Sequence, residues 1–477
     1  MKTKMNFTCI CCTLSAFVIC LSTSEGQTLG PEQQMGTGYE PAVNCDRIVD
    51  TTNNNKRIQF VWMDKYGTKQ GIHWAISHDL GVTWPNQVVF RGTGVIDPVA
   101  TCDIWSTGST REMYFGWLGT PQSAQTAEFQ RSPSGTFVDQ SSVMGAGDRP
   151  WLVANTASLY LSLHLGDTGY VKWAAVPNGS GFVNWSGSAI QVFTPDNNTN
   201  LVGEFPVATH RDTATPPNEQ AFLMAREYGT SSGTNFIRIK RSTNQGVNWS
   251  DDILRVNVDG ADDFVSDRDL RMVNYHMACD PNTSTSVNRV YAFYVINETA
   301  PWGGTRNVLY SLASTDGGNT WGNQQMVYTI SQSELPPNGF AVVPPNSSPG
   351  FYRIGRVWSC VDSNGNAYVT WMDNRYGEYS TTQDYWHVFC SRSTGEGQTW
   401  SAPIRVSGST TDPLGSASIG GYGNPDPFTN FAWNPPGDFL TCDADSNTLY
   451  VAWPDTRANQ GNPSALTNVY FRYVPFP

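Results

Sequence analysis

Hydrophobic and polar positions along this chain follow one pattern of short strands and turns. The copy at residues 356–406 shows it most fully. "RVWSCV" (Arg356–Val361) and "AYVTW" (Ala367–Trp371) are largely apolar, and the polar hairpin signal "DSNGN" separates them. "YWHVFCSR" (Tyr385–Arg392) predicts a third strand and "APIRV" (Ala402–Val406) a fourth. The unit is therefore four short strands joined by turns.

Six further units repeat this pattern. They occupy residues 47–90, 97–140, 148–193, 203–257, 268–327 and 439–473. One sheet cannot bury both of its faces alone, so such units are expected to pack around an axis. The repeats predict an all-β fold: a β-propeller of four-stranded antiparallel blades, seven in number, or six if one degenerate unit is an insertion. The last unit stops at its third strand, so the segment before Cys45 is predicted to supply the closing strand.

An eight-residue turn marks four of the units. Its aspartate can accept backbone N–H bonds, its glycine allows a positive φ, and its tryptophan can pack on a neighbouring strand. Asn244 and Gly395 replace the aspartate in two copies, which a turn tolerates and a catalytic acid does not. We therefore interpret the motif as structural. The copies are Ser77–Trp84, Ser242–Trp249, Ser314–Trp321 and Ser393–Trp400.

Composition and charge narrow the classes of function. Among 477 residues, 44 are glycine, 29 proline and 17 tryptophan, and only 15% are charged, which is typical of a turn-rich β protein. The net charge of −12 argues against a nucleic-acid or anionic-membrane partner, either of which requires a basic face.

The N-terminus has the pattern of an export signal. Lys2 and Lys4 precede the apolar run Phe7–Leu21, and small residues follow at Ser22–Gly26. We expect a signal peptide at 1–26, one propeller domain at 27–477 and a secreted protein. A lipid anchor at Cys20 is the weaker alternative, because the bulky Ile19 precedes it. Seven N-x-S/T sequons would matter only in a glycosylating host.

Six cysteines follow the leader, and their even number permits three disulfides in an exported protein. Six cysteines allow 15 pairings, and the sequence selects none of them. The alternative is that they are small buried residues at equivalent positions of the repeats. They are Cys45, Cys102, Cys279, Cys360, Cys390 and Cys442.

The repeated turn resembles the aspartate box, or bacterial neuraminidase repeat, of the sialidase superfamily, which also includes lectins and non-catalytic propellers. The resemblance implies a sialidase-like propeller whose boxes lie away from the active site. A sialidase holds the substrate carboxylate with three arginines, protonates with an aspartate and attacks with a tyrosine that a glutamate activates. "RI" at Arg47 corresponds to part of the family's arginine motif, although the flanking aromatic residue and proline are missing.

We expect the start of each inner strand to face the central mouth. Those positions are rich in charge, which suits recognition of an acidic or polyhydroxylated sugar. The alternative is that these charges pair and tie the blades together. They are Arg47, Asp97, Asp148 with Arg149, Glu204, Arg268 with Asp269 and Arg271, Tyr352 with Arg353, and Asp426.

The sequence thus predicts carbohydrate as the partner and an exo-glycosidase of sialidase type as the first hypothesis. Its substrate-binding residues are Arg47, Arg149, Arg271 and Arg353. Its catalytic residues are Asp64 or Asp97 as acid/base and Tyr352 with Glu204 as nucleophile pair. The alternatives are a non-catalytic glycan-binding propeller and an extracellular assembly subunit. The six histidines show no metal-ligand spacing, and no cofactor or metal is expected.

Overall fold

The structure is a computed structural model of the chain. The residues that it describes are 29–45, 57–63, 71–91, 96–102, 112–119, 123–130, 137–145, 147–155, 158–165, 168–175, 183–195, 199–202, 205–211, 219–229, 235–258, 274–281, 288–337, 352–376, 379–380, 383–408, 419–420, 440–455 and 468–477.

Seven antiparallel sheets make up the described chain, together with one short 3-10 helix, η1 (Gln332–Glu334). Each sheet is one blade, and its first strand below is the innermost. The blades are β2 (Tyr39–Cys45), β3 (Ile58–Met63), β4 (Gly71–Ser77), β5 (Asn86–Arg91); β6 (Ile96–Cys102), β7 (Glu112–Gly119), β8 (Ser123–Gln130), β9 (Phe137–Met144); β10 (Asp148–Ala154), β11 (Ser158–Leu165), β12 (Thr168–Ala175), β13 (Ile190–Phe193); β15 (Val207–Arg211), β16 (Glu219–Gly229), β17 (Asn235–Ser242), β18 (Leu254–Asn257), with β14 (Thr199–Val202) also on β16; β19 (Tyr275–Cys279), β20 (Val290–Thr299), β21 (Thr305–Ser314), β22 (Gln325–Thr329); β23 (Ile354–Val361), β24 (Ala367–Asp373), β26 (Gln383–Ser393), β27 (Ile404–Arg405), with β25 (Tyr379–Ser380) and β28 (Ile419–Gly420) also on β26; and β29 (Thr441–Asp445), β30 (Thr448–Asp455), β31 (Asn468–Pro475), β1 (Gln33–Thr37).

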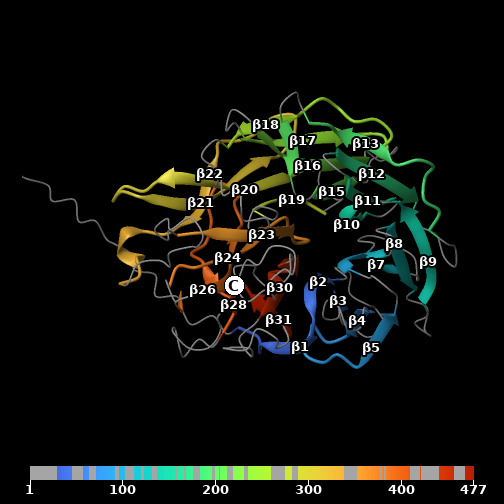
Figure 1. Ribbon diagram of the computed structural model, residues 1–477, viewed down its shortest axis with the longest axis horizontal. Coiled ribbons are helices and arrows are strands. Elements are labelled where there is room, and N and C mark those ends of the chain that lie inside the picture. Colours follow the sequence, from blue (N-terminus) through green and yellow to red (C-terminus); the bar gives the residue numbers. More distant parts are fainter. Residues whose placement is uncertain are drawn as a thin grey trace, which may run out of the picture.

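The innermost strands form a closed ring. Each contacts the innermost strand of the next blade, in the order β2, β6, β10, β15, β19, β23, β29 and back to β2. Figure 1 shows the sheets arranged around this centre, with the N-terminal blue strands beside the C-terminal red ones. The predicted all-β propeller is confirmed, and the described chain forms it with seven sheets.

The blade that closes the ring combines both ends of the chain. Strand β1 pairs with β31, with Gln33 opposite Phe471, and so completes the sheet of β29, β30 and β31. This confirms that the segment before Cys45 supplies the closing strand. The same segment also corrects the first unit: its inner strand is Tyr39–Cys45 and ends before Arg47, whereas the sequence analysis started that strand at Arg47.

The repeated turns have the predicted geometry. In the third copy, Asp316 accepts hydrogen bonds from the Ser314 hydroxyl at 2.8 Å and from the backbone N–H of Thr320 at 2.8 Å. Gly317 and Gly318 follow with φ of 69° and 83°. In the second copy Asn244 accepts the equivalent backbone bond from Asn248 at 2.8 Å. The turn therefore tolerates a neutral acceptor in place of the aspartate. In the fourth copy Gly395 offers no side-chain acceptor, and the turn still forms, with the Ser393 hydroxyl accepting the N–H of Gly397 at 3.0 Å.

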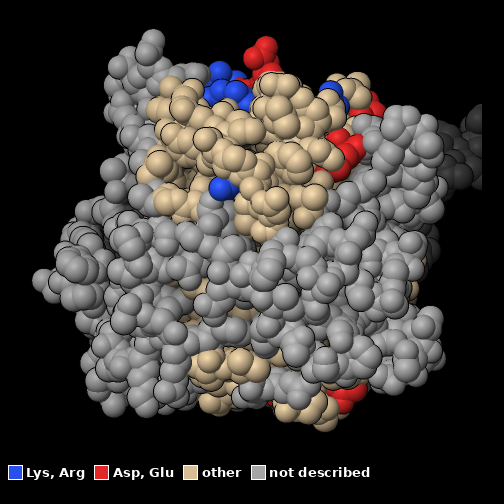
Figure 2. Space-filling model, turned by 90° about the vertical axis from the view of Figure 1, so that its right-hand side faces the viewer, with Lys and Arg blue, Asp and Glu red and all other residues tan. Residues whose placement is uncertain are grey.

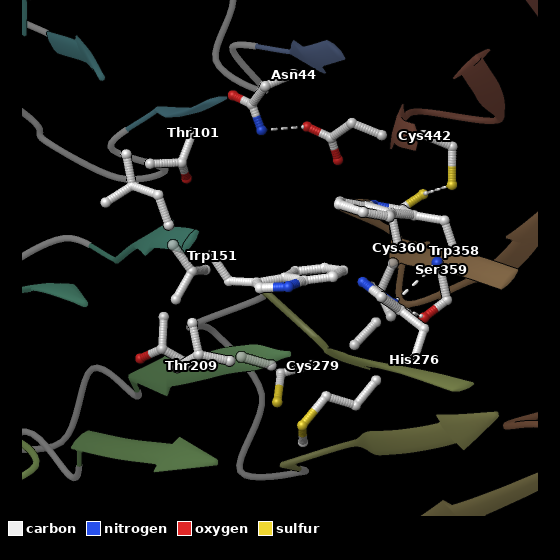
Figure 3. A pocket seen from close by; sticks show the side chains of 18 of the residues that line it. Asn44, Thr101, Trp151, Thr209, His276, Cys279, Trp358, Ser359, Cys360 and Cys442 are labelled. Carbon is white, nitrogen blue, oxygen red and sulfur yellow. Dashed lines mark hydrogen bonds between the residues drawn. The ribbon is translucent and has the colours of Figure 1, made fainter. Parts of the chain in front are cut away.

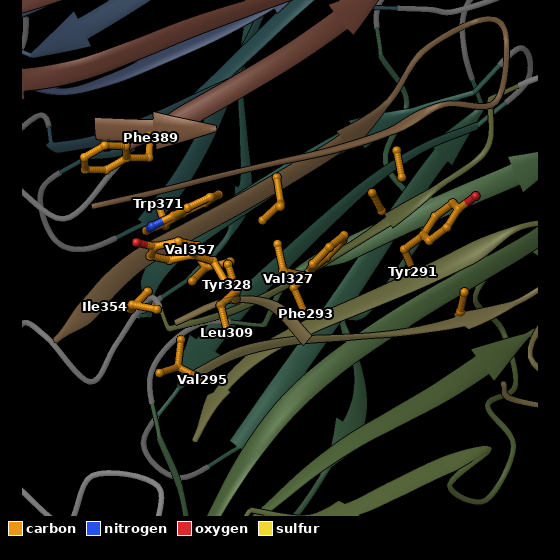
Figure 4. Packing of buried hydrophobic residues seen from close by; sticks show 14 of the residues in the cluster. Tyr291, Phe293, Val295, Leu309, Val327, Tyr328, Ile354, Val357, Trp371 and Phe389 are labelled. Atoms are coloured by element: carbon orange, nitrogen blue, oxygen red, sulfur yellow. The ribbon is translucent and has the colours of Figure 1, made fainter. Parts of the chain in front are cut away.

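The apolar faces of neighbouring blades pack against each other. One large cluster joins the blades of β19–β22 and β23–β27, and Figure 4 shows Tyr328, Trp371 and Phe389 layered within it. The described surface in Figure 2 carries acidic and basic side chains close together at its upper edge, not a patch of one sign. Within the described chain, no helix has both the length and the apolar character to cross a membrane.

Candidate functional site

A circle of contacts joins the blades where their inner strands surround the axis. Each of the seven blade interfaces in the described chain has at least one contact of this kind. In ring order they are Gln59 with Thr101, Thr101 with Ala154, Asn155 with Thr209, His210 with Asp280, His276 with Ser359, Cys360 with Cys442, and Asp443 with Asn44. Paired polar groups near the axis thus tie neighbouring blades together. The sequence analysis gave this structural role as the alternative to ligand binding for the charged residues at the mouth.

Three aromatic side chains from different blades meet on the axis. Trp151 of β10 and Trp358 of β23 are stacked, with ring centroids 4.2 Å apart and an interplanar angle of 19°. His276 of β19 lies 4.6 Å from Trp358 and 4.9 Å from Trp151. Figure 3 shows the three rings converging. We call Trp151, His276 and Trp358 the aromatic floor.

A cavity of about 120 Å³ lies on one side of this floor. We call it the central cavity. Among the described residues, its lining includes Trp151, Val207, His276 and Trp358. The lining of β2, β6 and β23 lies in the C-terminal half of each strand, whereas that of β15 starts at its first residue, Val207.

Polar groups of the cavity wall are largely engaged with the protein. Asp443 accepts hydrogen bonds from Asn44 Nδ2 at 2.8 Å and from the backbone N–H of Cys45 and of Ala444, each at 2.9 Å. Thr209 Oγ1 donates to the carbonyl of Gln220 at 3.1 Å. These bonds hold the wall rigid, and the side chains of Asn44, Thr101, Thr209 and Ser359 place amide and hydroxyl groups along it (Figure 3).

His276 is held as a neutral imidazole. Its Nδ1 accepts the backbone N–H of Ser359 at 3.0 Å and lies 2.7 Å from the Ser359 hydroxyl. An accepting Nδ1 carries no proton, so in the neutral ring the proton resides on Nε2. Burial lowers the pKa of His276 to about 3, because a buried imidazolium would lose its hydration. The floor is thus uncharged at neutral pH and contributes one N–H donor.

Tyr352, the predicted nucleophile, lies in a different environment. Its hydroxyl donates to Asp373 Oδ2 at 2.9 Å, and the side chain is buried among the apolar residues between two blades. Burial, and then the negative charge of Asp373, raise the pKa of Tyr352 well above its ordinary value. It does not line the central cavity. Among the described residues its acidic partner is Asp373, and Glu204, the partner proposed from the sequence, lies outside them.

Asp373 is saturated by donors. Besides the Tyr352 hydroxyl it accepts Trp371 Nε1 at 2.8 Å and forms an ion pair with Arg375 at 2.6 Å. The Arg375 guanidinium lies 4.1 Å from the ring centroid of Tyr328 and 3.5 Å from that of Phe389. Burial opposes its charge, but Asp373 raises the pKa of Arg375 above its ordinary value. We call Tyr352, Trp371, Asp373 and Arg375 the sealed cluster.

The motif that contains Asp64 has the same form in two other blades. Trp371 donates to Asp373, and Trp453 Nε1 donates to Asp455 Oδ2 at 3.3 Å, two residues along in each case. In both blades the aspartate is buried and fixes a tryptophan. These equivalents favour a structural role for the W-x-D motif, although Asp64 itself lies outside the described residues.

None of the other predicted site residues that the structure describes is seen to line the central cavity. Arg149 and Arg353 are both buried, and neither lines the central cavity. Asp97 is the second residue of β6, and its side chain lies outside the described part of the structure. The remaining predicted site residues lie outside the described residues: Arg47, Asp64, Glu204 and Arg271.

Sequence reasoning missed the aromatic floor, although a local signal was present. Arg149 and Arg356 both adopt positive φ, 54° and 52°, and each precedes a floor tryptophan by two residues. The strand register shifts at the same two places, between Asp148 and Trp151 and between Gly355 and Trp358. The shared pattern "R-x-W" at the start of two inner strands therefore marks a bulge that precedes each tryptophan.

Comparisons with known proteins return likenesses in fold only. No family model and no curated protein matches this sequence. Among solved structures, AofleA from Arthrobotrys oligospora is 12% identical, covering 81% of this chain and 92% of its own, with a TM-score of 0.40. A fungal lectin from Aleuria aurantia, described as a six-bladed β-propeller with a novel fucose recognition mode, is 12% identical over 80% of this chain and 99% of its own, with a TM-score of 0.39. The Hadza microbial sialidase Hz136 is 12% identical over 92% and 66%, with a TM-score of 0.37.

Proposed function

We propose that this propeller binds a neutral carbohydrate in the central cavity and does not cleave it. The observation that carries the proposal is the aromatic floor beneath a wall of amide and hydroxyl groups. A sugar ring has apolar C–H faces, which pack on indole rings, and an edge of hydroxyls, which exchange hydrogen bonds with such a wall. Concave sites that combine aromatic surface with a few fixed polar groups are typical of small-ligand binding.

The charge of the wall favours a neutral ligand. The residues described in the lining include no lysine or arginine. An acidic sugar is usually held through its carboxylate by arginine forks. The Asp443 carboxylate in the wall would also repel such a ligand. We therefore favour neutral glycans over sialylated ones.

The same lining supports binding more than hydrolysis. A glycosidase commonly places two carboxyl groups across the scissile bond. In the described lining Asp443 is the one carboxylate, and three hydrogen bonds already occupy it. Hydrolysis of sialosides stays a prediction of the aspartate-box resemblance, with Arg47, Asp64, Glu204 and Arg271 as its untested residues. The predicted export signal supports an extracellular location for a glycan-binding protein and for a sialidase alike.

A glycan array run beside a fluorogenic sialoside assay separates these possibilities. We expect the purified protein to retain neutral glycans on the array and to leave the sialoside intact. Sialoside turnover would favour the sialidase hypothesis, and exclusive retention of sialylated glycans would contradict the neutral ligand. An empty array without turnover would leave an extracellular assembly role as the better account.

A further inference from the structure

The central cavity brings two cysteines together. Cys360 of β23 and Cys442 of β29 belong to adjacent inner strands, and their sulfur atoms lie 3.6 Å apart (Figure 3). Both side chains line the cavity wall. We propose that Cys360 and Cys442 form a disulfide that joins these two blades covalently in the exported protein. The sequence alone allowed 15 pairings, and this distance selects one bond among them.

Hydrogen bonds made by side chains hold the two strands side by side next to the cysteines. Just beyond the cysteines, the Asn447 N–H donates to Asp362 Oδ2 at 3.2 Å, and the Ser363 hydroxyl donates to Asp445 Oδ1 at 3.1 Å. These bonds tie together the hairpins that follow the two strands. A disulfide needs sulfur atoms about 2.05 Å apart. Rotation of the two cysteine side chains about χ1 would bring the sulfur atoms closer while the hydrogen-bonded strands stay in place.

Both thiols face the central cavity, so a low-molecular-weight disulfide that reaches the cavity meets either sulfur. The thiolate of one cysteine attacks a sulfur of that disulfide, which forms a mixed disulfide and releases one small thiolate. The second cysteine then attacks the mixed disulfide at the protein sulfur, which forms the Cys360–Cys442 bond and releases the second thiolate. The two protein thiols lose two protons and two electrons, and the electrons reduce the small disulfide to two thiols.

Two other cysteines are poorer partners. Cys390 belongs to the same apolar cluster but lies on β26, away from the cavity lining. Burial, with the nearby Cys442 as a second cause, raises the pKa of the Cys390 thiol well above its ordinary value. Cys279 lines the cavity from β19, but burial and Asp280 raise the pKa of its thiol in the same way.

The bond would close a long segment of the chain. Its two cysteines are 82 positions apart, so the loop contains most of one blade. Cross-linking restricts the unfolded chain more when the loop is longer. The bond would also reinforce the blade that closes the ring and contains β1. Under oxidising conditions the bond would then restrain the relative motion of the two strands that line the cavity wall.

Peptide mapping of the full-length protein tests the proposal. The protein is equilibrated with oxidised glutathione or with dithiothreitol, alkylated, digested without reduction and analysed by mass spectrometry. We expect the oxidised sample to yield the Cys360 peptide linked to the Cys442 peptide, two hydrogens lighter than the separate peptides. The oxidised protein should also melt about 5 °C above the reduced protein. Recovery of both cysteines in alkylated form, or a bridge to Cys390, would overturn the proposal.

Variants add a second measurement. Cys360→Ser, Cys442→Ser and the double variant should all lose the redox-dependent melting shift to the same extent, because each removes the same bond. The control Cys279→Ser should retain the shift. A shift that persists in Cys442→Ser would contradict the pairing. If a serine variant does not fold, the peptide map of the unsubstituted protein still decides.

Discussion

The sealed cluster and the central cavity both combine tryptophan with a carboxylate, but in opposite settings. In the sealed cluster a tyrosine, a carboxylate and an arginine meet, as a sialidase site would require, yet Asp373 is fully buried and saturated by donors. In the central cavity the aromatic floor and an amide-and-hydroxyl wall surround open space. The comparison teaches that accessible surface, more than the list of residue types, separates a binding site from a structural network.

The largest expected effect is on the sealed cluster. Asp373→Asn keeps the shape of the side chain but leaves the buried Arg375 charge without its partner. We expect the free energy of unfolding to fall by about 3–5 kcal/mol, measured by chemical denaturation.

Tyr352→Phe serves as its control, because it removes one neutral donor from the same carboxylate. It should cost only about 1–2 kcal/mol and leave glycan binding unchanged. If Asp373→Asn did not lower the free energy of unfolding, the Asp373 carboxylate would not be needed to neutralise Arg375. The contrast between a structural cluster and a binding cavity would then fail.

The next effect concerns the floor of the cavity and depends on pH. The pKa of His276 is about 3 in the folded protein and 6.5 ordinarily, so on acidification the unfolded state takes up the proton first. His276 therefore stabilises the fold fully above pH 6.5, and this contribution declines as the pH falls toward 3. The slope is about 1.4 kcal/mol per pH unit.

Denaturation curves of the unsubstituted protein and of His276→Phe, taken between pH 4.5 and 7.5, measure this slope as a difference. We expect the variant to lose less stability in acid. Parallel curves for the two proteins would show that His276 titrates with an ordinary pKa and is hydrated in the folded protein.

The smallest effect is expected at the periphery. Asp316→Asn should change the free energy of unfolding by less than about 0.5 kcal/mol, because Asn244 fills the same place in another copy with the same backbone bond. Asp316→Ala removes the acceptor and should cost more. Equal costs for the two variants would mean that the negative charge, and not the acceptor oxygen, maintains the turn.

The sequence predicted the repeated features of the fold because they are local. The turn at Ser314–Trp321 contains its own hydrogen bonds, and strand alternation identifies most units to within a few residues. The first inner strand was misplaced because Tyr39–Cys45 precedes the clearest part of its unit. The cavity was missed because Trp151, His276 and Trp358 meet only after the ring closes. The contact between these three side chains depends on how three blades are positioned relative to one another, and a local sequence pattern contains no information on that.

The most direct test of the central claim compares two half-buried tryptophans. Trp358 belongs to the aromatic floor, and Trp249 lies in a repeated turn. The measurement is the dissociation constant, by isothermal titration calorimetry, for a neutral glycan retained on the array. The account predicts that Trp358→Ala weakens binding about 30-fold or more, equivalent to about 2 kcal/mol, and that Trp249→Ala leaves it unchanged. Equal affinity in Trp358→Ala and the unsubstituted protein would contradict the assignment of the central cavity as the binding site.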